Sequence, residues 1–115
     1  MIRAATLFTL GFYLLPGVAF ADDMAAMNKA GSPADKAFMR SMQAMMKNMA
    51  AKPTGNPDKD FALMMMPHHQ GAIDMAKVEL QYGKDPELRQ LATDIVAAQE
   101  KEIAGMKAWL AKNGK

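Results

Sequence analysis

Residues 56–86, NPDKDFALMMMPHHQGAIDMAKVELQYGKDP, decide the fold that we expect for this chain. The stretch opens with an asparagine followed by a proline, a pair typical of a helix N-cap and its first turn. Asp58 and Asp60 follow within that turn, where the helix dipole favours negative charge. Apolar residues then recur at helical spacing until Gly83. We therefore predict one long helix over about residues 57–82.

The same start signal occurs before and after this stretch. Ser32-Pro33 and Asp85-Pro86 again place a capping residue before a proline, and they predict helices over about 33–52 and 85–113. No segment shows the alternation that is typical of a strand. The short connections favour antiparallel neighbours. We predict an all-α domain over residues 33–115, built as an antiparallel bundle of three to four helices.

The N-terminal residues have the pattern of a secretory signal peptide. Arg3 provides a positive start, an apolar run follows, and Ala19-Phe20-Ala21 offers a small-x-small cleavage site. We expect residues 1–21 to be removed, which leaves a flexible, methionine-containing leader over 22–32. The mature protein is then expected to be periplasmic or secreted, with no attachment to the membrane after cleavage.

Charge and motifs argue against several classes of function. The formal net charge is +2 and falls to +1 when Arg3 is lost, whereas nucleic-acid binding needs a strongly basic face. The chain has neither the His-Glu-x-x-His motif of zinc proteases nor a glycine-rich phosphate loop. We therefore expect a binding protein and not an enzyme.

Methionine is the unusual component of this chain. There are 13 methionines and no cysteine in 115 residues, and the run MMMPHH at 64–69 places three of them beside the only two histidines. Methionine is not among the common residues of an average domain. Thioether sulfur is a soft ligand that favours Cu(I), and imidazole binds copper as well. The run therefore indicates copper, with Cu(I) favoured and Cu(II) a second option.

Helical spacing predicts which residues face the core. In the long helix, His68 lies at the centre of the inward stripe and His69 lies at its flank. Buried polar groups need partners, so we expect Gln99 and Glu102 to hydrogen-bond His68, and His68 to matter more for metal binding than His69. The stripes of the three helices are Phe38, Met42, Met45 and Met49; Phe61, Met65, His68, Ala72, Met75 and Glu79; and Leu88, Ile95, Gln99, Glu102, Met106 and Leu110.

Residues 60–76, which contain the run HHQGAIDMA, resemble the signature of the domain of unknown function 305 family, and residues 87–110 fit its second half. The resemblance covers about residues 35–113. It implies a secreted, ferritin-like four-helix bundle, and some members are described as periplasmic copper-binding proteins in copper tolerance. It also implicates both histidines, Met65, Met75 and the methionines of the first helix.

We expect a protein that sequesters or shuttles copper. His68 and His69 would supply nitrogen, and Glu102 would orient a histidine or bind Cu(II) through oxygen. Sulfur would come from Met65, Met75, Met42, Met45 and Met106.

Two other functions fit the same residues. One is a periplasmic chaperone or adaptor that binds partners through a methionine-rich apolar face. The other is a copper-dependent redox enzyme with an open coordination position. The chain supplies three clear helices, so a fourth would come from residues 22–31 or from a second subunit, and a homodimer is one expected partner. Other periplasmic copper-handling proteins are another.

Overall fold

The computed structural model describes residues 31–114, which form three helices and contain no strand. The helices are α2 (Pro33–Asn48), α3 (Pro57–Tyr82) and α4 (Pro86–Asn113). The prediction of an all-α fold is confirmed for this part of the chain. The predicted signal peptide and leader residues 22–30 lie outside the described residues. None of the helices described is long and apolar enough to cross a membrane.

Each helix begins at the cap-plus-proline pair that the sequence indicates. Ser32 and Asp35 form a capping box, in which each side chain accepts a hydrogen bond from the other residue's backbone N–H. The side chains of Asn56 and Asp85 accept backbone N–H bonds in the first turns of α3 and α4. These bonds satisfy N–H groups that have no partner within a helix, so the starts of the helices are determined locally.

The end of α2 differs from the prediction. The helix stops at Asn48, four residues before the expected end at residue 52. Pro53 disfavours helical geometry in the residue before it. The next two residues, Thr54 and Gly55, are hydrogen-bonded to the first turn of α3. There the Asp60 carboxylate accepts bonds from the Thr54 N–H and hydroxyl, at 2.7 and 2.6 Å, and from the Gly55 N–H. Gly55 has a φ of +91°, a conformation that glycine adopts without strain.

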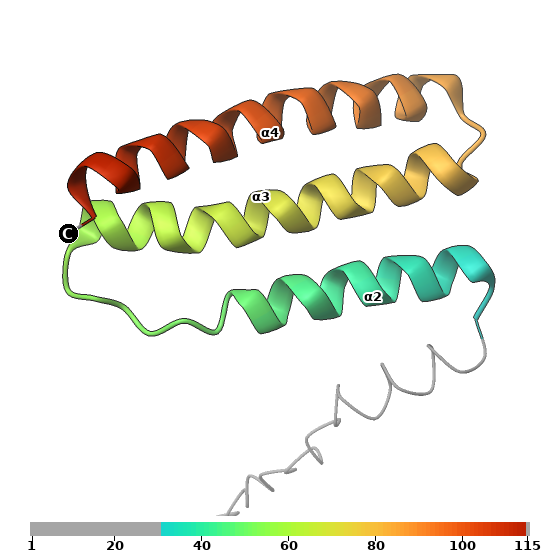
Figure 1. Cartoon of the computed structure of the whole chain (residues 1–115). Coiled ribbons are helices and arrows are strands. Elements are labelled where there is room, and N and C mark those ends of the chain that lie inside the picture. Colours follow the sequence, from blue (N-terminus) through green and yellow to red (C-terminus); the bar gives the residue numbers. More distant parts are fainter. Residues whose placement is uncertain (1–30, 115) are drawn as a thin grey trace, which may run out of the picture.

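The three helices lie side by side with α3 in the middle (Figure 1). α3 packs against both α2 and α4, whereas the backbones of α2 and α4 do not approach each other closely in the described part of the chain. The two connections lie at opposite ends of α3 (Figure 1). A fourth helix does not occur within residues 31–114. The helices therefore form one layer, and α3 has a neighbour on each flank.

Small residues on α3 allow this close packing. A Cβ atom added at Gly71 would lie 2.5–2.8 Å from three side-chain atoms of Met45, so α2 approaches α3 closely at this glycine. Ile73 is almost completely buried, at 1% exposure. The other buried apolar residues lie on the facing sides of the helices: Met39, Ala62, Ala76, Val78, Ala92 and Ile103.

The predicted inward stripes are not the core of this layer. Phe61 and Met75 of α3 are 60% and 38% exposed, and Leu88 of α4 is 54% exposed. The reason is geometric, because a helix between two neighbours buries its two flanks and leaves the stripe between them uncovered. The prediction of where each helix is apolar remains useful, but the assignment of those stripes to the core of a single chain was wrong.

Candidate metal centre

His69 of α3 and Glu102 of α4 join the two helices at the centre of the candidate site. The His69 Nε2 and Glu102 Oε2 atoms are 2.5 Å apart. The other ring nitrogen, Nδ1, is buried and has no hydrogen-bond partner among residues 31–114. When the ring is neutral and its Nε2–H donates to the carboxylate, Nδ1 carries the free lone pair. The pair thus orients an imidazole whose second nitrogen has no hydrogen-bond partner in the described residues.

Two methionines line the same cavity as this pair. Met65 lies one turn before His69 on α3, and Met106 lies one turn after Glu102 on α4. All four side chains line a cavity of about 420 Å³, together with Phe61 and Gly105. The cavity therefore gathers one imidazole, one carboxylate and two thioethers from predicted site residues.

His68 lies on the other side of Met65. It is exposed, and it lines a cavity of about 310 Å³ with Met49, Phe61, Met64 and Met65. The centroids of the two histidine rings are 6.3 Å apart. The predicted burial of His68 and its bond to Glu102 were therefore wrong, and His69 has that role. Adjacent helical residues point about 100° apart, and the hydrogen bond shows that α4 lies on the side of His69.

The remaining predicted ligands lie apart from the four in the cavity. Met45 packs against Gly71 at the contact between α2 and α3. Met42 is 37% exposed on α2. Met75 lines a third cavity with Phe38, and it is ten residues beyond Met65, about 15 Å along a helix. The eight predicted donors are thus too widely spread to bind one ion.

The donors predicted from the sequence did not include Met49 and Met64, and the unpaired side-chain amide of Gln99 was not expected. Met49 and Met64 line the cavity of His68, and the i, i+4 spacing of Met64 and His68 was a signal that could have identified the contact of Met64. Gln99 has a buried side-chain oxygen without a hydrogen-bond partner in the described region. Within residues 31–114, His, Cys, Asp and Glu side chains form no group of three suited to a metal ion.

Two comparisons with known proteins give matches. The profile of the family described as "Domain of unknown function (DUF305)" matches residues 21–110. An uncharacterized protein of Acanthamoeba polyphaga mimivirus is 45% identical over 53 residues, which are 46% of this chain. The chain covers only 35% of the length of that viral protein. The matched family residues include α2, α3 and most of α4.

Proposed function

The chain belongs to the family described as domain of unknown function 305, and we propose that this member binds copper in the periplasm. It would sequester or shuttle the ion and so contribute to copper tolerance, as an antiparallel, ferritin-like bundle of the exported chain. One observation supports this proposal most strongly: His69, Glu102, Met65 and Met106 line a single cavity between α3 and α4.

The chemistry of these donors suits Cu(I). Met65 and Met106 offer soft thioether sulfur, and His69 offers Nδ1, a buried nitrogen without a partner in the described residues. Glu102 accepts the Nε2–H and thereby fixes the ring orientation and raises the basicity of the ligand nitrogen. The Glu102 side chain is 59% exposed. It is therefore free to turn toward a harder Cu(II) ion as an oxygen ligand.

A second donor set lies beside the first. His68, Met49 and Met64 line the neighbouring cavity, and Met65 lines both cavities. His68 is exposed, whereas the side chain of His69 is 14% exposed. In the single chain, copper held at the inner set would thus be adjacent to an outer set within reach of a partner, as transfer to another copper-handling protein requires.

Methionine-to-leucine variants test the sulfur ligands without removing packing, because leucine and methionine have similar volumes. We expect Met65→Leu and Met106→Leu each to weaken Cu(I) binding about tenfold or more, measured by competition with a Cu(I) chelator, since each removes one ligand. Met46→Leu is the matched control, because Met46 is 58% exposed on α2, away from both cavities. Unchanged binding in both cavity variants, or retention of Zn(II) as tight as that of Cu(I), would reject the proposal.

The two histidines test which cavity binds the ion first. We expect His69→Ala to weaken Cu(I) binding more than His68→Ala, because only His69 is oriented by Glu102. Glu102→Gln should lower the affinity about 10–100-fold, the usual effect of losing a partner that orients a ligand. A larger loss in His68→Ala than in His69→Ala would instead move the principal site to the cavity of His68.

A further inference from the structure

An apolar surface runs along one side of all three helices. We call it the open face, and its larger members are Phe38 of α2, Met49 just after α2, Phe61, Met65 and Met75 of α3, and Leu88, Leu91, Ile95 and Met106 of α4. Most of these residues belong to the stripes that helical spacing assigns to a core. In the single chain the same side chains line cavities that remain open to solvent.

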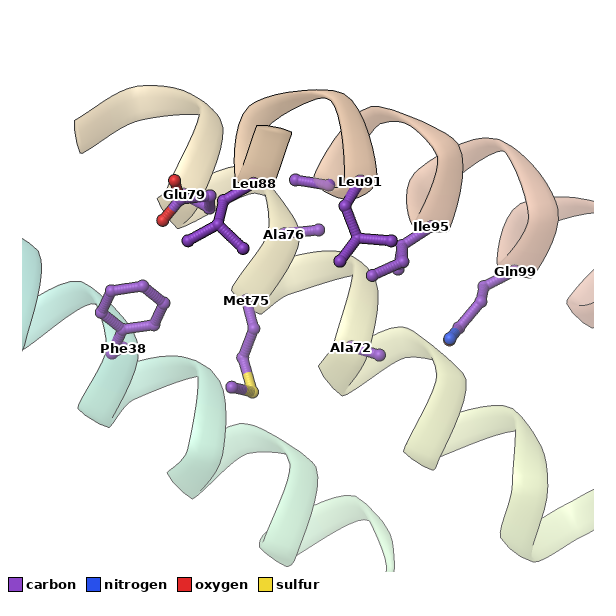
Figure 2. A pocket seen from close by; sticks show the side chains of 10 residues that line it. Phe38, Ala72, Met75, Ala76, Glu79, Leu88, Leu91, Ile95 and Gln99 are labelled. Carbon is purple, nitrogen blue, oxygen red and sulfur yellow. The ribbon is translucent and has the colours of Figure 1, made fainter. Parts of the chain in front are cut away.

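One end of the open face is a groove. A cavity of about 310 Å³ lies there, and its lining includes Phe38 of α2, Met75 of α3, and Leu88 and Leu91 of α4. Figure 2 shows the side chains of Phe38, Met75 and Leu91 extending from three different helices toward this space. The groove is therefore formed by the whole layer and not by one helix.

The exposure of this face is energetically unfavourable. Phe61, Leu88 and Leu91 are 60%, 54% and 53% exposed. Burial of apolar side chains is favourable roughly in proportion to the apolar area that is removed from water. Monomeric proteins rarely expose contiguous apolar surface beyond a few hundred Å², and larger patches mark interaction sites. An occupant of the open face is therefore expected.

We propose that a second copy of this chain docks on the open face, so that the two layers bury their apolar stripes against each other. A second copy has stripes of the same length, and a two-fold interface uses one self-complementary patch on both subunits. The formal net charge of +1 after the proposed cleavage opposes this association only weakly. α3 and α4 provide most of this contact surface.

A helix formed by the leader would be too short to cover the face. After the proposed cleavage, residues 22–30 precede the described chain, and nine residues span about 14 Å as a helix. The stripe of α3 from Phe61 to Glu79 is about 27 Å long. The inference does not depend on copper, because burial of apolar surface alone favours the association.

Sedimentation or light scattering of the mature chain without metal tests the proposal. We expect a dimeric mass that shifts toward monomer on dilution. The double variant Leu88→Glu with Leu91→Glu should be monomeric with unchanged helical circular dichroism, because both side chains are more than half exposed in the single chain. The control, Gln81→Glu with Ala97→Glu, adds the same charge at exposed positions away from the open face and should remain dimeric.

Cross-linking provides a second measurement. The chain has no cysteine, so Leu91→Cys and Ala97→Cys each introduce one thiol. A short bismaleimide should join two Leu91→Cys chains much faster than two Ala97→Cys chains. A monomeric mass at every concentration, or equal cross-linking of both variants, would overturn the proposal. Normal copper binding by a monomer would leave the proposed function intact while rejecting this interface.

Discussion

Gly71→Ala is the sharpest test of how α2 and α3 pack. A Cβ at position 71 would lie 2.5, 2.6 and 2.8 Å from the Sδ, Cγ and Cβ atoms of Met45. The thioether can rotate away, but the Met45 Cβ moves only if α2 moves. Gly105 of α4 provides the matched control, because an added Cβ there meets no atom of the described chain within 4 Å.

The two substitutions share one energy term and differ in another. Replacing a helical glycine with alanine favours the helix by about 0.5–1 kcal/mol. Overpacking in a close contact costs about 1–3 kcal/mol, and only Gly71→Ala incurs it. Because the helix-forming term cancels in the difference, Gly71→Ala should be less stable than Gly105→Ala by about 1–3 kcal/mol. For a domain of this size, each kcal/mol shifts the melting temperature by roughly 4–8 °C.

Thermal and urea denaturation of both variants would measure this difference. Gly105→Ala should melt above the wild type, and Gly71→Ala should melt below Gly105→Ala by at least several degrees. Combining Gly71→Ala with Met45→Ala removes the two closest contacting atoms and should recover part of the loss. Equal melting temperatures for Gly71→Ala and Gly105→Ala would refute the close contact between α2 and α3.

Substitutions at three further positions test the local bonds that position the helices. Ser32→Ala should lower the free energy of unfolding by about 1 kcal/mol through loss of the α2 cap, whereas Ser32→Gly should cost only a few tenths; thermal melts of both variants check this. The bonds from the Thr54 hydroxyl and N–H hold the pKa of Asp60 below its usual 3.8. They therefore stabilise the fold above that pH, and this stabilisation is lost as the pH falls through the folded pKa. The difference in unfolding free energy between wild type and Asp60→Asn, measured by urea titration, should shrink in acid. Arg89 donates to two carbonyls at the end of α3, including that of Gly83 at 3.0 Å. Arg89→Ala should lower the free energy of unfolding, measured by urea titration, by about 1.5 kcal/mol. An unchanged value would mean that water replaces the guanidinium as the donor.

The candidate donors could be recognised from the sequence, but their grouping could not. The soft chemistry of methionine and the rarity of histidine identified Met65 and His69, and helical spacing on the third helix added Glu102 and Met106. Their meeting in one cavity depends on the register between α3 and α4, which brings residue 69 opposite residue 102. This register cannot be predicted from local sequence patterns, because it follows from packing between residues 33 positions apart in the chain.

Helix starts and the all-α class were determined by the sequence itself, because each start depends on bonds within a few residues. Ser32, Asn56 and Asp85 cap their own helices, and the proline that follows each of them fits the first turn of a helix. Which stripe is buried was decided only by the tertiary structure. Periodicity shows that a helix has an apolar side, but burial depends on where the neighbouring helices lie. With α2 and α4 on the two flanks of α3, the flanks are covered and Phe61 faces outward. The same geometry places His69, and not His68, against α4.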